Sequence, residues 1–410
     1  MKSPFKIRAP SFRSSSFRSP SCKSPTFDAQ AINETIRSKL AAAGLDTTAA
    51  PMRGVTETIR RALASASVLP TQSVAVANED IIDVLARAVD VGPRAKSPDK
   101  RSRAQSQVQS SLSGGTFESH EYANPAGVLS YKLYVPAQIT AAPALIVMLH
   151  GCTQSADDFA AGTRMNQLAD QHGFLVAYPE QSSGANPSKC WNWFKAQDQV
   201  RDCGEPSLIV GIVRVLAARY KVDPRRIFVA GMSAGAAMAV TLGETYPDVF
   251  AAVGAHSGLP YRSANDIASA MLAMKGGRSG MPGLKMKLGG AAPPSTTARP
   301  AVPIIVFHGD RDHTVQHSNA IEIVQQAINA CTAVHPNVTL HVNTERGTAS
   351  SGRSYTHTFY ADATGANRIE FWTVHGAGHA WSGGDASGTY TDVSGPDASA
   401  EMLRFFLSLG

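Results

Sequence analysis

From residue 114 onwards, short apolar runs alternate with longer segments in which apolar residues recur every three or four positions. The short runs are almost wholly apolar, which is typical of strands buried on both faces of a parallel sheet. The longer segments have the periodicity of amphipathic helices. Strands are predicted at residues 116–122, 129–135, 144–150, 174–178, 250–255, 304–307, 355–360 and 368–374, with one more beginning at Ile227. Helices are predicted at residues 155–170, 206–220, 316–330 and 396–409, with one more ending at Tyr246.

Strands that alternate with helices imply a mostly parallel central sheet flanked by helices on both faces. We therefore predict an α/β domain for residues 114–410. Residues 271–300 interrupt the alternation, because Met and Leu clusters lie there among many Gly, Pro and Lys residues. This insertion is interpreted either as a segment above the functional site or as an exposed loop.

Residues 1–113 differ in character and are predicted to form an appendage. The first 27 residues are rich in Ser, Pro and basic side chains, which favours a disordered tail. Two or three short amphipathic helices and a charged linker follow. The apolar stripes of these helices would pack on the main domain, on a second copy, or on a hydrophobic surface, and packing on protein is the simplest of the three.

Charge and hydropathy exclude several classes of function. The formal net charge is +6, but six basic residues and no acid precede Asp28, so part of this charge is local. We therefore do not expect nucleic-acid binding. No apolar run has the length of a transmembrane helix. The basic start lacks the apolar stretch of a secretory signal, which favours the cytoplasm.

The strongest chemical signal is the Gly-X-Ser-X-Gly pattern at residues 231–235. An apolar run precedes it and a small-residue helix start follows it, which is the arrangement of a nucleophile elbow. The two glycines suit a turn that brings the strand and helix backbones too close for side chains. Ser233 is therefore predicted to be a nucleophile.

A serine hydroxyl needs a base to take its proton and an acid to orient that base. In doubly wound hydrolases they follow the serine in the order Asp, His, from loops after later strands. Asp310 and Asp312 are both candidates for the acid. Asp312 is favoured because Asp310 lies in the turn directly after the strand and would stabilise the turn itself. His379 is favoured over His375 as the base, because a Gly-Ala-Gly approach lets it reach over the sheet.

The tetrahedral intermediate of acyl transfer needs two N–H donors for its oxyanion. Ala234, directly after the predicted nucleophile, supplies one. The loop at residues 150–154 follows an early buried strand, and Gly151 lets its backbone approach closely. The N–H of Cys152 is therefore predicted as the second donor, and His150 is interpreted as a residue that braces the loop.

Residues 190–194 read Cys-Trp-Asn-Trp-Phe and concentrate aromatic side chains. Such a cluster either forms local core or walls a substrate pocket. Trp191 and Trp193, together with Trp381 beside the predicted base, are the pocket candidates. The chain has no Gly-rich phosphate loop, no dinucleotide fingerprint and no Cys/His spacing suited to zinc, so no cofactor or metal is expected.

The chain has five cysteines, an odd number, and no signal peptide is recognised before them, which favours free thiols. Three of them lie near the expected loops of the site, so one disulfide stays open as an alternative.

Six motifs, in this order along the chain, resemble the polyhydroxybutyrate depolymerase family of esterases, which is related to feruloyl and acetylxylan esterases. They are Leu-His-Gly-Cys-Thr-Gln at 149–154, Cys-Trp-Asn-Trp-Phe at 190–194, Gly-Glu-Pro at 204–206, Gly-Met-Ser-Ala-Gly at 231–235, His-Gly at 308–309 with Asp312, and Gly-His-Ala-Trp-Ser-Gly-Gly at 378–384. The resemblance covers about residues 116–409. It implies an α/β-hydrolase fold with a Ser233, Asp312, His379 triad, and it raises the hypothesis of a Cys152–Cys190 disulfide near the pocket.

The resemblance implies a serine esterase that works through an acyl-enzyme, with poly(3-hydroxybutyrate) or its oligomers as the expected substrate. Feruloyl or acetyl esters of plant cell-wall polymers are the alternative, as is acyl transfer to an alcohol by the same triad. A non-catalytic alternative has residues 1–113 bind a hydrophobic granule or a partner, with the hydrolase domain as a passenger. The expected partners are thus an ester or polyester substrate and, through the N-terminal region, a granule surface.

Overall fold

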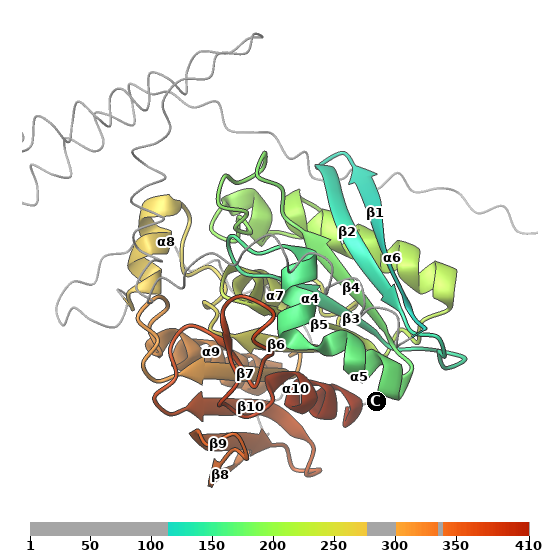
Figure 1. The fold of residues 1–410 in the computed structure, drawn as a ribbon. Helices are drawn as coiled ribbons and strands as arrows, with labels where there is room; N and C mark the ends of the chain where they lie inside the picture. Colours follow the sequence, from blue (N-terminus) through green and yellow to red (C-terminus); the bar gives the residue numbers. More distant parts are fainter. Residues whose placement is uncertain (1–113, 277–300, 335–338, 410) are drawn as a thin grey trace, which may run out of the picture. The chain divides into compact units, whose positions relative to one another are not determined.

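The computed structural model describes residues 114–276, 301–334 and 339–409, and it forms a central sheet between two layers of helices (Figure 1). Ten strands of the described residues lie in one sheet in the order β1-β2-β4-β3-β5-β6-β7-β10-β9-β8. Their bounds are β1 Thr116–Asn124, β2 Gly127–Val135, β3 Leu145–Leu149, β4 Leu175–Glu180, β5 Ile227–Met232, β6 Ala252–His256, β7 Ile304–Gly309, β8 His341–Thr348, β9 Ser354–Ala361 and β10 Asn367–Val374. The predicted appendage lies outside the described residues, so its helices, its granule contact and the boundary after residue 113 stay predictions.

The middle of the sheet is parallel and its two margins are antiparallel. Strands β4, β3, β5, β6, β7 and β10 pair in parallel, whereas β1, β2, β9 and β8 join through antiparallel ladders. Strand β3 connects onward to β4 on one side, and β5 lies on its other side. The carboxyl ends of β3 and β5 therefore form the switch point where open α/β sheets place their ligands.

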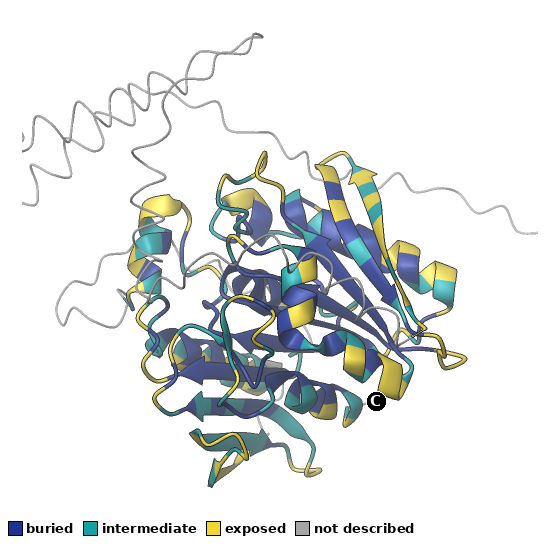
Figure 2. Ribbon diagram, in the orientation of Figure 1, coloured by how far each residue is buried: buried dark blue, intermediate teal, exposed yellow. Residues whose placement is uncertain are grey.

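Helices cover both faces of this sheet. One face carries α6 (Gly204–Tyr220), α7 (Ala234–Thr245) and α9 (Ser318–Val334), and the other carries α4 (Ala156–Thr163), α5 (Met165–His172) and α10 (Ala398–Leu407). Alternate residues of each strand enter opposite cores: Val147 packs with the first helix set and Ile146 with the second. The central strands are buried throughout (Figure 2), which explains why their sequences are almost wholly apolar.

Two features differ from the sequence prediction. The single helix predicted at 155–170 is two helices, because Arg164 adopts a left-handed conformation with φ 54° and ends α4 before α5 begins. Strand β8 was not predicted. Seven of its eight residues are exposed, so this edge strand has no apolar period to mark it.

The remaining described elements are short. They are the 3-10 helix η3 Ala196–Gln199, the helix α8 Ile267–Met274, and the paired strands β11 Trp381–Ser382 and β12 Thr391–Asp392. Helix α8 occupies the start of the predicted insertion, and residues 277–300 of that insertion lie outside the described residues.

The start of α7 packs directly against the end of β3. A Cβ atom added at Gly235 would collide with the carbonyl oxygens of Leu149 and His150, and one at Gly231 would lie 2.5 Å from the carbonyl carbon and oxygen of Gly235. Both contacts are with backbone, which cannot move aside as a side chain can. Glycine at these two positions therefore sets how closely the elbow approaches the loop after β3.

The substitution Gly235→Ala is expected to lower the free energy of unfolding by about 1–3 kcal/mol or more, because the added methyl group overpacks a backbone contact. Alanine is otherwise the better helix former, so a loss cannot come from helix propensity. Chemical denaturation of the variant beside Gly184→Ala measures the effect, since a Cβ at Gly184 would meet only the Ser182 hydroxyl at 3.8 Å. Equal midpoints for both variants would contradict the packing argument.

Candidate active site

Ser233 joins β5 to α7 and has the backbone strain of a nucleophile elbow. Its φ is 56° and its ψ is −121°, a conformation that non-glycine residues rarely adopt. The N–H of Ser233 donates to the carbonyl of His256 at 2.9 Å, which fixes the turn to the end of β6. The side chain thus sits at the carboxyl edge of the parallel strands, beside the switch point.

The loop after β3 lies against this serine. A Cβ atom added at Gly151 would lie 3.6 Å from Ser233 Cβ, an ordinary van der Waals distance, so the two segments lie in contact here. Ala234 is the first residue of α7, and its N–H has no acceptor within the helix. Among the described residues, no acceptor is found for the N–H of Cys152 either. Both predicted oxyanion donors therefore come from segments that meet at Ser233.

The predicted acid and base form a buried pair. His379 Nδ1 lies 2.7 Å from Asp312 Oδ2, while Asp312 Oδ1 accepts from the N–H groups of Thr314 and Val315 at 2.9 and 2.8 Å. Burial would raise the pKa of Asp312, but the hydrogen bond from His379, the nearby histidines and the Val315 N–H lower it overall. Asp312 is thus a fixed carboxylate that orients His379. Among the described residues, no hydrogen bond links Ser233 Oγ to His379.

The competing residues form a second pair. Asp310 Oδ2 lies 2.9 Å from His375 Nδ1, and Asp310 Oδ1 accepts from the Gly376 N–H at 2.7 Å. The two side chains of this pair are 36% and 40% exposed, whereas the side chains of Asp312 and His379 are 0% and 11% exposed. The two aspartates thus serve different histidines, and the pair of Asp312 with His379 is the buried one.

His256 links the elbow to the segment that carries His379, and the sequence analysis missed it. Its carbonyl accepts from Ser233, and its ring Nε2 accepts from the Ser382 N–H at 3.0 Å. Burial, with smaller effects of His308 and His379, lowers the pKa of His256 to about 3, so the ring is neutral and can accept. The ring also stacks on Trp381 and Phe307. Its place directly after the predicted strand at 250–255 was the available signal.

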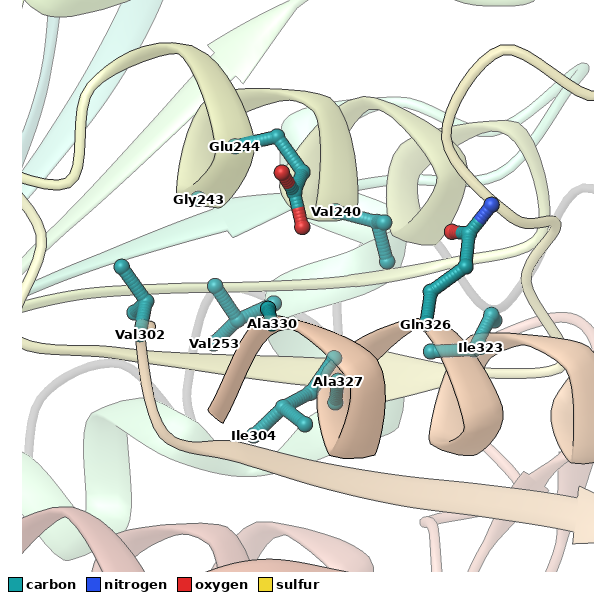
Figure 3. Close-up of a pocket in the computed structure, with 10 residues that line it drawn as sticks. All are labelled: Val240, Gly243, Glu244, Val253, Val302, Ile304, Ile323, Gln326, Ala327 and Ala330. Carbon is teal, nitrogen blue, oxygen red and sulfur yellow. The ribbon is translucent and has the colours of Figure 1, made fainter. Parts of the chain in front are cut away.

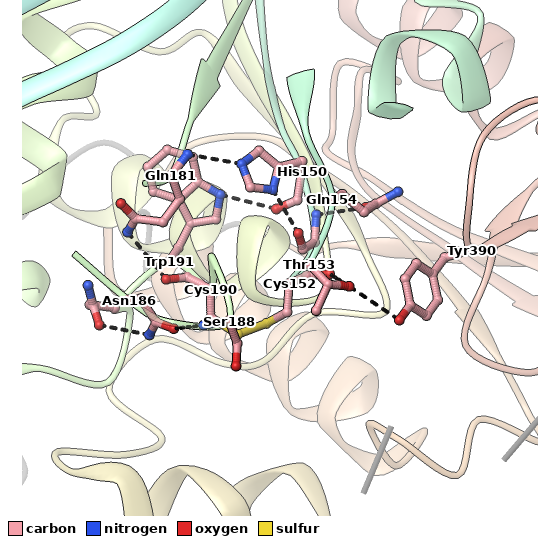
Figure 4. Close-up of a disulfide and its surroundings, with 12 residues drawn as sticks. His150, Cys152, Thr153, Gln154, Gln181, Asn186, Ser188, Cys190, Trp191 and Tyr390 are labelled. Carbon is pink, nitrogen blue, oxygen red and sulfur yellow. Dashed lines mark hydrogen bonds between the residues drawn. A yellow bond between two sulfur atoms is a disulfide. The ribbon is translucent and has the colours of Figure 1, made fainter. Parts of the chain in front are cut away.

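His150 braces the loop at residues 150–154, which carries the predicted oxyanion donor Cys152 and is called the oxyanion loop below, as the sequence predicts. Its Nδ1–H donates to the Gly151 carbonyl at 2.7 Å, and its Nε2 accepts from the Gln181 N–H at 3.0 Å (Figure 4). Burial lowers the pKa of His150, which keeps the ring neutral. Trp191 Nε1 donates to the His150 carbonyl at 3.1 Å, so the aromatic loop and the oxyanion loop are joined.

A disulfide between Cys152 and Cys190 joins the same two loops (Figure 4). The hypothesis of this bond is confirmed, and the expectation of free thiols is wrong for these two cysteines and for Cys203, which is also disulfide-bonded. Cys331 is a free thiol. The bond fixes the residue whose N–H is the predicted oxyanion donor to the start of the aromatic loop.

The predicted pocket residues are buried. Trp191, Trp193 and Trp381 have exposed fractions of 0%, 5% and 1%. Trp381 Nε1 donates to Ser399 Oγ at 3.1 Å, and the ring packs edge-on against Phe159. The three side chains therefore present almost no surface to a substrate.

Two buried acids, Glu205 and Asp198, are linked by hydrogen bonds to the aromatic loop at residues 190–194. The Glu205 carboxylate accepts three hydrogen bonds: from the backbone N–H of Asn192 at 2.8 Å, from the side-chain amide of Asn192, and from Gln181 Nε2. Asp198 Oδ1 in turn accepts from the backbone N–H of Glu205 at 2.7 Å. Burial, together with the charge of Asp198, raises the pKa of Glu205 to about 7, and burial raises the pKa of Asp198 to about 6. The sequence analysis quoted Glu205 as part of a motif but gave it no role.

A separate small cavity carries no comparable chemistry. It has a volume of about 30 Å³ and lies between α7 and α9 over β6 and β7 (Figure 3). Its walls are mostly apolar, with Val253 and Ile304 near the amino ends of their strands. It is therefore at the opposite end of the sheet from Ser233.

Metal-binding groups and membrane-spanning helices are both absent from the described part of the chain. Within residues 114–276, 301–334 and 339–409, no group of three or more His, Cys, Asp or Glu side chains could hold a metal ion. The helices in these ranges are all too short or too polar to span a bilayer.

Comparison with known proteins identifies the class. Residues 129–339 match the family model described as "Esterase PHB depolymerase". The sheet and its helices are those of an α/β-hydrolase, and the solved acetyl xylan esterase from Aspergillus awamori superposes with a TM-score of 0.53 at 18% identity, over 71% of this chain and 99% of that one. The protein therefore belongs to the polyhydroxybutyrate depolymerase family of esterases.

The chain is also similar to three named relatives. It is 34% identical over 258 residues to poly(3-hydroxyalkanoate) depolymerase C of Paucimonas lemoignei, which is 62% of this chain and 59% of that protein. It is 38% identical over 149 residues to feruloyl esterase B of Neurospora crassa, which is 36% of this chain and 50% of that protein. It is 30% identical over 210 residues to the probable acetylxylan esterase A of Neosartorya fischeri, which is 50% of this chain and 56% of that protein. The chain thus spans half to three fifths of these relatives.

Replacing Cys152 and Cys190 together by alanine is expected to lower the free energy of unfolding by about 2–4 kcal/mol, because the bond closes a loop between residues 38 positions apart. Denaturant unfolding measures the loss, and Cys331→Ala, at the free thiol, is the matched control. A double variant as stable as the control would show that the bond contributes little.

The acid pair predicts a stability that falls as pH rises from about 4 to about 7. In that window the folded protein keeps protons on Asp198 and Glu205 that the unfolded chain has released, so raising the pH disfavours folding, by an amount on the order of 5 kcal/mol. Denaturation across this range should show a shallower decline for Asp198→Asn, whose amide oxygen can keep the bond to the Glu205 N–H. The exposed-site variant Glu121→Gln should behave as the wild type. An unchanged slope in Asp198→Asn would refute the assignment.

Proposed function

We propose that this esterase hydrolyses 3-hydroxyalkanoate polyesters or their oligomers, with poly(3-hydroxybutyrate) as the first candidate. The observation that carries the proposal is the similarity to poly(3-hydroxyalkanoate) depolymerase C. That similarity extends over 258 residues, against 149 for the feruloyl esterase and 210 for the acetylxylan esterase. It therefore covers more of the chain than either alternative does.

The proposed chemistry uses Ser233, His379 and Asp312 as a triad. Asp312 accepts from Nδ1–H of His379, which leaves Nε2 free to take the proton from Ser233 Oγ. The serine oxygen attacks the ester carbonyl, and the N–H groups of Cys152 and Ala234 stabilise the oxyanion. His379 then returns the proton to the departing alcohol. Water, activated in the same way, releases the acid and restores the serine.

An ester of a plant cell-wall polymer is the second candidate. The feruloyl esterase B relative is 38% identical, a higher identity than that of the depolymerase, although over a shorter segment. A feruloyl substrate would need an aromatic-binding surface. The tryptophans that the sequence analysis offered for that purpose are buried, so this alternative has less support.

The triad is tested by single substitutions assayed on a short-chain nitrophenyl ester. We expect Ser233→Ala to lower kcat by about 10⁶-fold, because the nucleophile is lost. Asp312→Asn should lower kcat by about 10⁴-fold, because the amide would present the wrong hydrogen-bonding group to His379. Asp310→Asn should lose far less, since its histidine is the exposed one. Circular dichroism and unfolding midpoints check that each variant is folded. Wild-type activity in Ser233→Ala would end the serine-hydrolase assignment.

The substrate class is tested by comparing three esters under identical conditions. 3-Hydroxybutyrate trimer, methyl ferulate and acetylated xylan are assayed with the wild type and with Ser233→Ala as the blank. The proposal expects the highest kcat/KM for the trimer. Preference for methyl ferulate or for acetylated xylan would favour the alternative instead, and adding an alcohol acceptor with product analysis detects acyl transfer.

A further inference from the structure

Glu205 is a buried acid that takes no part in the proposed triad. It lies in the first turn of α6. Its Oε1 accepts from the side-chain amides of Asn192 and Gln181, and its Oε2 accepts from the Asn192 N–H at 2.8 Å. A carboxylate is costly to bury without such donors. The two residues that supply them belong to different segments, and both segments lead to the oxyanion loop.

The first segment is the end of β4. Gln181 directly follows this strand, and its N–H donates to Nε2 of His150 at 3.0 Å. On the other side of the ring, Nδ1–H of His150 donates to the Gly151 carbonyl at 2.7 Å. Glu205 is therefore connected to the oxyanion loop through one side chain and one imidazole ring.

The Gly151 carbonyl belongs to the same peptide group as the N–H of Cys152, the predicted oxyanion donor. Among the described residues the peptide bonds are all trans. The carbonyl and the N–H of this planar group therefore point in opposite directions, and a bond that fixes one of them fixes the other. His150 thus aims the donor, and any residue that positions His150 acts on the oxyanion hole.

The second segment is the aromatic loop. The indole of Trp191, which precedes Asn192, donates to the His150 carbonyl at 3.1 Å. Cys190, one residue earlier, forms the disulfide with Cys152. The same carboxylate therefore holds both segments that fasten the oxyanion loop.

Glutamine could not replace Glu205 in these contacts. With its oxygen at the place of Oε1, the amide would turn its NH₂ group toward the N–H of Asn192, which is backbone and cannot turn away. With its oxygen at the place of Oε2, the NH₂ group would face Nε2 of Gln181. That amide is held in its orientation, because its Nε2 donates to the Cys190 carbonyl at 3.2 Å and its Oε1 accepts from the Ser182 N–H at 3.1 Å. In either orientation one donor faces another.

We propose that Glu205 is a positioning residue for the oxyanion hole. Its carboxylate holds the two segments in place, so that His150 aims the N–H of Cys152 at the developing oxyanion. This role rests on the triad and the oxyanion donors of the proposed function. It concerns the transition state rather than substrate binding, because the negative oxygen forms only during attack on the ester. Loss of the carboxylate should therefore lower kcat and leave KM unchanged.

The test assays Glu205→Gln on a short-chain nitrophenyl ester at about pH 8, where the wild type carries the carboxylate because the pKa of Glu205 is about 7. We expect kcat to fall by about 10-fold to 100-fold with KM within about twofold of the wild type, since a displaced donor costs less than a deleted one. A trifluoromethyl ketone, whose adduct with Ser233 carries the same oxyanion, should bind more weakly by a similar factor in a calorimetric titration.

Glu370→Gln is the matched control. This glutamate is also buried, and its carboxylate bonds to His357 and Arg404, outside the two segments around the oxyanion loop. The control should lose stability but keep kcat. A folded Glu205→Gln that keeps kcat would overturn the proposal. So would a loss of kcat that Glu370→Gln shares, or one that leaves the affinity for the ketone unchanged.

Gln181→Met provides the test if Glu205→Gln does not fold. Methionine has a similar length, removes only the side-chain bonds and leaves the N–H that donates to His150. The same losses of kcat and of ketone affinity are expected of it, and their absence overturns the proposal.

Failure of the proposed function is a separate outcome. Because a nitrophenyl ester is the substrate, the result does not depend on whether polyesters are cleaved. If the wild type cleaves this ester no faster than Ser233→Ala does, the serine-esterase function fails. The ketone titration then decides the positioning role alone: binding that Glu205→Gln weakens supports it, and absent or equal binding overturns it.

Discussion

The candidate site depends on one close contact, the approach of the start of α7 to the end of β3. Only glycine at 231 and 235 lets these backbones meet, and the contact brings Ser233 against the loop that carries Cys152. Once this distance is fixed, both predicted oxyanion donors lie beside the serine without any side chain having to reach them. The disulfide and the His150 ring then hold the loop in that place.

Burial separates two pairs that are alike in composition. Asp312 with His379 and Asp310 with His375 are both carboxylate–imidazole pairs in the same two loops, with similar distances. The first pair is shielded from water, where a hydrogen bond to a charged group is stronger and its geometry is more fixed. The second is open to solvent. The same chemical motif is thus suited to orienting a base only where it is shielded from water.

Whether a segment's structure could be predicted from the sequence depends on which of its side chains are buried. The central strands and the elbow were predictable, because strands buried on both faces are apolar throughout and the elbow demands glycine. Strand β8 was not, since an exposed edge strand has no hydrophobic period. The break at Arg164 and the roles of His256 and Glu205 were missed for another reason. They depend on contacts between residues distant in the chain, which a local pattern does not contain.

The same division bears on substrate specificity. The residues that brace Ser233, including His256, Glu205 and the tryptophans, are buried and form hydrogen bonds to one another and to backbone. Changing any of them would disturb the site itself, so they cannot vary freely to suit a new ester. The edge strand β8, by contrast, is exposed along seven of its eight residues. Differences in substrate between this chain and its esterase relatives should therefore arise at exposed residues rather than among those that brace the serine.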